Sequence, residues 1–195
     1  MFFYDLPRFS VDLDFNLTYI KKEVIVYAKV HRILNRYGKI YDEAKKFHGY
    51  IIVLDYGINE RKLKVEISNR PFRDRYEIKN LLGISIKVMI QEDMFAHKLC
   101  ALLDRNAIAN RDIFDCWFFM QRRTPLNKQL VESRMKMSLP EYFQRCITRM
   151  ESISDKGLMQ GMGELMDNKM KKFVQAKMRH EFIGLLKFYK DYPIL

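Results

Sequence analysis

Short segments with alternating apolar and polar residues dominate the first 90 positions of the chain. The first strand is predicted at residues 11–17 because its side chains alternate strictly between the two types. Its apolar positions, which we expect to face a core, are Val11, Leu13 and Phe15. Its polar positions on the opposite side are Asp12, Asp14 and Asn16. Residues 18–37 then place apolar side chains every three to four positions, which predicts a helix that stops at Gly38.

Two further strand-forming regions are predicted before residue 90. The β-rich run 48–56 and the alternating run 62–68 flank the turn-forming residues 57–60, so we expect a β-hairpin. Residues 76–89 predict one or two short strands that are interrupted at Gly83.

Helical periodicity is strongest from residue 91 onward. Helices are predicted at residues 91–103 and 110–120, and Asn110 is the expected N-cap of the second. Their inward-facing residues are expected to be Phe95, Leu99, Leu102, Ile113, Phe114, Trp117 and Phe118. Beyond Pro125 we expect three or four helices, the last one at residues 168–189.

The composition changes near residue 122, from mixed segments to helical segments rich in Met, Lys and Arg. We therefore predict a mixed region at residues 1–121 and a helical region at residues 122–195. The expected fold class is α+β, with a mixed sheet and flanking helices followed by a C-terminal helical bundle. The methionine-rich stretch 159–178 fits either a partner-binding surface or, more commonly, an ordinary helical core.

The net charge of +11 favours partners that carry phosphate or carboxylate groups, such as nucleotides, RNA, DNA or acidic proteins. The cysteines are widely spaced and form no CxxC or Cys/His cluster, which argues against a zinc site or a disulfide framework. This cysteine usage predicts a reducing, cytoplasmic location. Since no apolar run approaches about 18 residues, we expect no membrane span and no membrane partner.

Paired carboxylates are the main candidates for chemistry. On a strand, Asp12 and Asp14 point to the same side, so two like charges lie close together. A divalent cation relieves that repulsion, and Mg²⁺ typically binds one or two carboxylates together with substrate phosphates. Glu66 lies on a second strand whose polar side also carries Lys62 and Lys64, and could complete a two-metal site. A DxD pair on its own also occurs on ordinary solvated strands.

Four stretches of the sequence resemble the AbiEii/AbiGii-type nucleotidyltransferase toxins, in family order. The segment FYDLPRFSVDLDF at residues 3–15 is similar to the signature around the paired aspartates of that family. KLKVE at 62–66, DMFAHK at 93–98 and RDIFD at 111–115 resemble the later family motifs. The match covers roughly residues 3–119, and the helical tail agrees in general character only.

The resemblance implies a cytoplasmic enzyme that uses two Mg²⁺ ions and a nucleoside triphosphate. The acceptor would be RNA, in particular the 3′ end of a tRNA, and a cognate antitoxin protein would be a partner. The implied metal ligands are Asp12, Asp14 and Glu66, which with Lys98 and Asp112 are also the implied catalytic residues. The implied nucleotide-binding residues are Ser10, Lys62, Lys98 and Asp115.

Simpler interpretations exist for several of these residues. Lys98 could be a solvated helix residue, and Asp115 could pair with Arg111 one turn away. Ser10 could be a strand residue with a local hydroxyl hydrogen bond.

The family's glycine-glycine-serine/threonine element is missing ahead of Asp12. In such enzymes this element opens a helix whose N–H groups receive the triphosphate. A start site assigned too late, or a truncated gene, would explain the difference, and we expect an exposed sheet edge beside the first strand. The alternative function is therefore an inactive remnant that only binds nucleotide, RNA or antitoxin. An unrelated nucleic-acid-binding module is less favoured, because no reader motif occurs.

Overall fold

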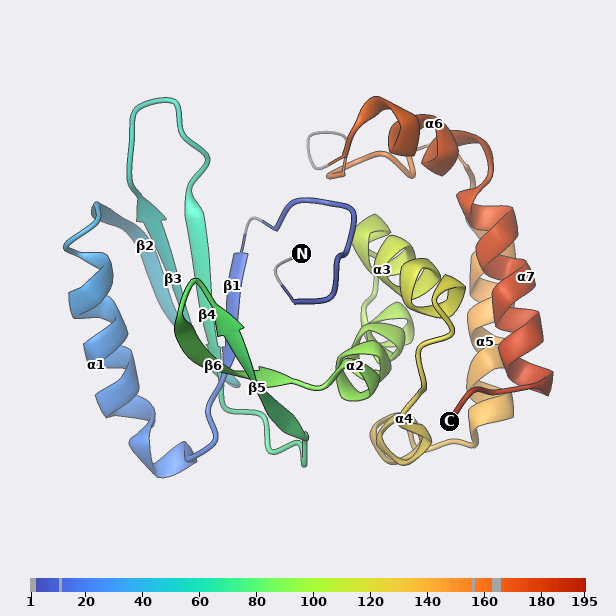
Figure 1. Cartoon of the computed structure of the whole chain (residues 1–195), viewed down its shortest axis with the longest axis horizontal. Helices are drawn as coiled ribbons and strands as arrows, with labels where there is room; N and C mark the ends of the chain where they lie inside the picture. The colour runs from blue at the N-terminus through green and yellow to red at the C-terminus, as the bar shows by residue number, and fades with distance from the viewer. Residues whose placement is uncertain (1–2, 11, 156, 163–165) are drawn as a thin grey trace. The chain divides into compact units, whose positions relative to one another are not determined.

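The computed structural model describes residues 3–10, 12–155, 157–162 and 166–195, and the chain forms two compact units (Figure 1). One unit, Ser10–Arg73, is called the sheet unit here. The other combines Met1–Phe9 with Asp74–Leu195 and is called the helical unit. The composition boundary expected at residue 122 falls inside the helical unit, and a domain division there stays a prediction. None of the helices described is both long and apolar enough to span a membrane.

The sheet unit contains a four-stranded mixed sheet and one helix. Its strands are β1 (Asp12–Asn16), β2 (Lys39–Lys46), β3 (Gly49–Asp55) and β4 (Leu63–Ser68). The order is β1-β4-β3-β2, with β1 parallel to β4 and the other pairs antiparallel. The helical prediction for residues 18–37 is realised as a 3-10 turn, Ile20–Lys22, followed by α1 (Glu23–Leu34). The hairpin predicted from residues 48–68 is confirmed as β3 and β4.

Strand β2 has no counterpart among the sequence predictions. Its residues are mostly polar and exposed, and the pairing with β3 shifts at a bulge between Ile40 and Asp42. An edge strand that is solvated on both faces needs no apolar alternation. The apolar periodicity therefore could not predict β2. The strand nevertheless pairs with β3 along its length, from Lys39 opposite Asp55 to Lys46 opposite Gly49.

The small core of the sheet unit lies between α1 and one face of the sheet. Leu34 of α1 packs with Ile52, Leu54 and Val65, which are at most 8% exposed. Leu13 pairs with Val65, so it is on the same face, but α1 packs mainly over β3. The prediction that Leu13 and Phe15 are buried is therefore wrong: they are 41% and 50% exposed. Val11, the third residue of that prediction, lies outside the described residues. The expected exposed edge is found here, since β1 ends the order of the described strands.

The helical unit begins with a β-hairpin and continues with helices. Its elements are β5 (Tyr76–Leu81), β6 (Ile84–Met89), α2 (Gln91–Asp104), α3 (Asn110–Gln121), α4 (Lys128–Met135), α5 (Leu139–Ser152), α6 (Asn168–Ala176) and α7 (Met178–Asp191). The predicted break at Gly83 is confirmed, because Leu82 and Gly83 turn the hairpin with positive φ angles of 52° and 82°. The prediction that Asn110 caps α3 is wrong: the cap is Ala109, and the Asn110 amide donates to the carbonyls of Gly157 and Gln160.

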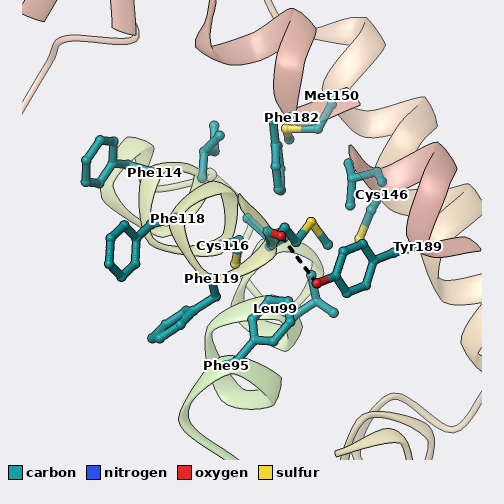
Figure 2. Close-up of a cluster of buried hydrophobic side chains, with 14 of the residues drawn as sticks. Phe95, Leu99, Phe114, Cys116, Phe118, Phe119, Cys146, Met150, Phe182 and Tyr189 are labelled. Carbon is teal, nitrogen blue, oxygen red and sulfur yellow. Dashed lines mark hydrogen bonds between the residues drawn. The ribbon is translucent and has the colours of Figure 1, made fainter. Parts of the chain in front are cut away.

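One hydrophobic core joins the helices of this unit. Figure 2 shows aromatic and sulfur-containing side chains of α2 and α3 converging with those of α5 and α7. The apolar faces predicted for α2 and α3 are confirmed, with Phe95, Leu99 and Ile113 fully buried. The methionine-rich stretch contributes to the same core, because Met162 and Met178 are also fully buried. The three cysteines are free thiols, and all are buried.

Candidate functional site

Strands β1 and β4 bring the candidate metal ligands side by side. In their parallel register Asp12 is paired with Lys64, and Asp14 is paired with Glu66. Paired residues on neighbouring strands point to the same face of a sheet. Because Leu13 and Val65 occupy the face that α1 covers, the carboxylates lie on the opposite face. The prediction that a glutamate of a neighbouring strand joins the two aspartates is consistent with this register.

The ammonium group of Lys64 lies among these carboxylates. Its Nζ is 3.2 Å from Glu66 Oε2 and 4.0 Å from Asp12 Oδ2. The three side chains are only 19–33% exposed, so the cation neutralises charge that would otherwise be poorly solvated. In the described part of the chain, no three His, Cys, Asp or Glu side chains are grouped so as to hold a metal ion. Two oxygen ligands plus substrate phosphates are nevertheless enough for Mg²⁺, and the donor set fits that ion.

Two other residues implied by the resemblance lie near the ends of these strands. The Ser10 hydroxyl donates to the carbonyl oxygen of Asp12 at 3.2 Å. This is the local hydrogen bond expected if Ser10 is an ordinary residue beside the strand. The Lys62 ammonium lies 2.9 Å from the centroid of the Tyr41 ring on β2, in a cation–π contact. Lys64, not Lys62, is therefore the lysine beside the carboxylates. Nucleotide binding by Ser10 and Lys62 stays a prediction.

The sheet unit also has a shallow hollow, and it lies away from the carboxylates. Its volume is about 510 Å³, and His31, Asn35 and residues 39–43 line it. Strand β2 is at the opposite end of the sheet order from β1. The hollow is open and mixed in polarity, so it has none of the enclosure typical of a small-molecule site.

In the helical unit, Lys98 of α2 meets two aspartates of α3. Its Nζ is 3.0 Å from Asp115 Oδ2 and 3.5 Å from Asp112 Oδ1. Both carboxylates are almost fully buried, whereas the Lys98 side chain is 31% exposed. Lys98 is therefore more than a solvated helix residue: two buried anions contact its ammonium group, while part of the side chain reaches solvent. The cluster is assembled by α2 and α3, which pack against each other.

The partner of Asp115 differs from the one that helical spacing suggested. Arg8 donates from Nε to Asp115 Oδ1 and from Nη2 to Asp115 Oδ2, both at 2.6 Å. This bidentate pair is buried, with side-chain exposures of 5% for Arg8 and 1% for Asp115. On the other aspartate, Arg105 Nη1 lies 3.4 Å from Asp112 Oδ2, an oxygen that accepts no hydrogen bond within the described structure.

The electrostatics of the cluster favour the charged forms of Lys98 and Asp115. Burial alone would lower the pKa of the Lys98 ammonium, but the charges of Asp115 and Asp112 outweigh burial and raise it. Burial would raise the pKa of the Asp115 carboxyl, yet the Arg8 hydrogen bonds and the Lys98 charge lower it. Lys98 is consequently a permanent cation near neutral pH.

Sequence reasoning overlooked Arg8 and Arg105 as members of this cluster. Arg8 and Asp5 are the two charged residues in an otherwise largely apolar stretch, Phe3–Phe9, and a charge in such a stretch was the available signal. A buried ion pair between residues 107 positions apart leaves no periodic pattern in the sequence. Arg105 follows the end of α2 directly and carried no signal of this kind.

Comparisons with known proteins agree with these motifs. The family model for the nucleotidyl transferase AbiEii toxin of type IV toxin–antitoxin systems matches residues 1–182. No curated protein is significantly similar in sequence. A crystal structure of a candidate nucleotidyltransferase from H. pylori shares 22% identity and a TM-score of 0.59, covering 98% of this chain and 82% of its own.

JHP933 from Helicobacter pylori is similar at 22% identity and a TM-score of 0.56, covering 97% of this chain and 79% of its own chain. At this level of identity, the two structures show a shared fold. The family match spans most of the sequence and includes the strands with the carboxylates and the helices with Lys98. The chain belongs to the AbiEii family of nucleotidyl transferase toxins of type IV toxin–antitoxin systems, and it is a nucleotidyltransferase.

Proposed function

We propose that this nucleotidyltransferase moves a nucleotidyl group from a nucleoside triphosphate to an RNA acceptor in a reaction that depends on Mg²⁺. The proposed acceptor is the 3′ end of a tRNA, and a cognate antitoxin restrains the activity in the cytoplasm. The observation that carries the proposal is the shared face of Asp12, Asp14 and Glu66 on the parallel strands β1 and β4. The net charge of +11 supports a polyanionic acceptor.

The sheet unit supplies the proposed metal ligands. Asp12 and Asp14 would hold the cations and Glu66 would assist, since carboxylate oxygens suit Mg²⁺. When bound, two such ions would lower the charge on the triphosphate and stabilise the attacking and leaving oxygens. Lys64 would then leave the carboxylates, because an ammonium and a divalent cation compete for the same oxygens. Glu66 could also accept the proton of the attacking hydroxyl.

The helical unit supplies the proposed phosphate-binding cation. Lys98 presents an ammonium whose charge is fixed by Asp112 and Asp115, and a triphosphate would be its ligand. The two aspartates are 1–2% exposed, so they would act through Lys98 and not by touching the nucleotide. Ser10 and Lys62 are proposed as weaker contributors to nucleotide binding.

The test is a transfer reaction with the full chain. The protein is incubated with MgCl₂, tRNA and each of the four labelled triphosphates in turn, and labelled RNA is measured. Asp12→Ala is expected to lower labelling by at least about 100-fold, since the ligand acts in the reaction itself. Asp42→Ala is the matched control, an exposed aspartate on β2 of the same sheet. Equal labelling by wild type and Asp12→Ala would refute the metal role of Asp12.

The alternative is a protein that binds nucleotide, RNA or antitoxin without chemistry. Neutralisation of Asp12 and Glu66 by Lys64 is the observation in its favour, since the carboxylates then need no metal. Under this alternative the wild type binds a triphosphate in equilibrium dialysis but labels no RNA. In that case Asp12→Ala leaves the binding unchanged, because no bound metal depends on that carboxylate.

A further inference from the structure

Arg8 is the most deeply buried cation of the cluster around Lys98. Its guanidinium occupies both carboxylate oxygens of Asp115 at 2.6 Å, and it also donates to the Phe9 carbonyl at 3.0 Å. Only 5% of its side chain is exposed, so a ligand in solution has little access to it. An effect of Arg8 on a ligand is therefore indirect and passes through the neighbouring charges of the cluster, Asp115 and Lys98.

The charges of the cluster do not balance, and the excess is positive. Three cations, Arg8, Lys98 and Arg105, meet two carboxylates, Asp112 and Asp115. The carboxylates are 1–2% exposed, whereas Lys98 and Arg105 are 31% and 46% exposed. A ligand that approaches from solvent consequently meets cationic atoms, with the anions behind them.

We propose that Arg8 is a positioning residue that occupies Asp115 and so leaves the Lys98 ammonium free to bind a polyphosphate. Without Arg8, Lys98 would be the one remaining ion-pair partner of Asp115 shown among the described residues, and Lys98 would be drawn into a closed pair. A bidentate arginine–carboxylate pair is stronger than a lysine–carboxylate pair. Asp115 therefore pairs preferentially with Arg8. This inference rests on the proposed role of Lys98 in binding triphosphate.

Two observations support this division of roles. The Asp115–Lys98 contact is longer, at 3.0 Å, than either Arg8–Asp115 hydrogen bond. Among the influences on Lys98, the Asp115 and Asp112 charges raise its pKa against the opposing effect of burial, and the nearby charge of Arg8 lowers it. Arg8 thus weakens the hold of the carboxylates on the Lys98 ammonium.

The test uses inorganic tripolyphosphate and the full chain, without metal or RNA. Binding is measured by isothermal titration calorimetry, and folding is checked by circular dichroism. Lys98→Gln defines the binding that depends on Lys98. Arg8→Gln is expected to weaken that binding about tenfold, because the net charge of the cluster falls from +1 to zero. Arg8→Lys keeps the charge and is expected to retain most of the binding.

Two further variants separate a positioning role from a structural one. Arg179→Gln is the matched control, because Arg179 also forms a 2.6 Å pair with an aspartate, Asp155, of the helical unit. It is expected to leave tripolyphosphate binding unchanged. The double variant Arg8→Gln/Asp115→Asn removes one charge of each sign, restores the excess of +1, and is expected to recover the wild-type affinity.

The outcomes distinguish the proposed role of Arg8 from the proposed role of Lys98. If Arg8→Gln is folded and binds tripolyphosphate like the wild type, while Lys98→Gln binds it less well, the role of Arg8 is overturned. The role of Lys98 then stands. Lys98→Gln that binds like the wild type overturns the proposed role of Lys98, and the role of Arg8 with it. Loss in Arg8→Gln without recovery in the double variant overturns the charge-balance argument.

Discussion

Asp14 on β1 stands opposite Glu66 on β4 in a parallel strand pair, on the sheet face that α1 does not cover. Strand pairing therefore fixes their proximity, and long loops are not needed to bring them together. The neighbouring pair in the register, Asp12 and Lys64, places a cation in the same row. The Lys64 ammonium, within 4.0 Å of Asp12 and Glu66, offsets part of the repulsion among the three carboxylates.

Lys64→Gln is predicted to strengthen Mn²⁺ binding in the absence of nucleotide. The Lys64 ammonium lies 3.2 Å from Glu66 and 4.0 Å from Asp12, so it competes with a metal ion for these oxygens. The expected gain in affinity is about two- to fivefold, because partly exposed ion pairs are weak. Free Mn²⁺ is measured by electron paramagnetic resonance, with Lys46→Gln on β2 as the control. An unchanged or weaker affinity in Lys64→Gln would contradict the competition.

Phe15→Ala is predicted to cost much less stability than Ile67→Ala, although the two residues are register partners. Phe15 is 50% exposed on the edge strand, and Ile67 is 1% exposed. We expect a loss of about 1 kcal/mol for Phe15→Ala and about 2–4 kcal/mol for Ile67→Ala. Hydrogen exchange of amides in β3 and β4, followed by mass spectrometry, reports this unit separately. Equal losses would mean that Phe15 is covered in solution.

The same pair of positions illustrates how far the sequence could predict the fold. Alternation correctly identified β1 and β4, and it put Asp12, Asp14 and Glu66 on polar faces. It could not predict that Leu13 and Phe15 are exposed, because burial depends on which strands α1 covers. Strand β2 was missed since an exposed edge strand has no apolar periodicity. Tertiary placement, and not local pattern, decides these features.

The helical unit shows the corresponding limits for helices and for the site. The helix predicted at residues 168–189 is divided into α6 and α7 at Lys177, whose backbone φ of −135° is not helical. No glycine or proline marks that position, and the apolar spacing continues through it. For the site, motif spacing led to Lys98, Asp112 and Asp115. The contribution of Arg8 depends on a contact across 107 positions, which only the fold reveals.

Gly49→Ala is predicted to disrupt the β2–β3 hairpin. Gly49 has a φ of +122°, and a Cβ atom there would lie 1.8 Å from the Ile67 carbonyl oxygen. Since a backbone atom cannot easily move aside, we expect the free energy of unfolding of the sheet unit to fall by at least about 3 kcal/mol. Gly184→Ala on α7 is the matched control, because its Cβ meets open space. For Gly184→Ala we expect the free energy of unfolding to rise by about 0.5–1 kcal/mol. Urea titrations of both variants provide the comparison, and a stable Gly49→Ala protein would contradict the geometry.

Asp115→Asn is predicted to change how the helical unit responds to acid. Burial would raise the pKa of Asp115, but the hydrogen bonds from Arg8 and the charge of Lys98 lower it below the ordinary value of 3.8. A lowered pKa in the folded state stabilises the fold at pH values above the unfolded pKa. That contribution is lost as the pH falls below about 4 and through the folded pKa. The wild type should therefore lose stability steeply in this window.

The asparagine variant lacks this titration, so its stability should be lower at pH 7 and should fall less steeply between pH 4 and pH 2. At pH 7 the substitution leaves Arg8 buried without an anion, which is costly because only 5% of its side chain reaches solvent. Trp117 of α3 lies in this unit, so urea unfolding followed by its fluorescence at each pH gives the two curves. Asp155→Asn is the control: the pKa of Asp155 is also lowered, chiefly by its hydrogen bonds to Arg179, but Asp155 is partly exposed. Parallel curves for the wild type and Asp115→Asn would show that Asp115 is not held as a buried anion by Arg8 and Lys98.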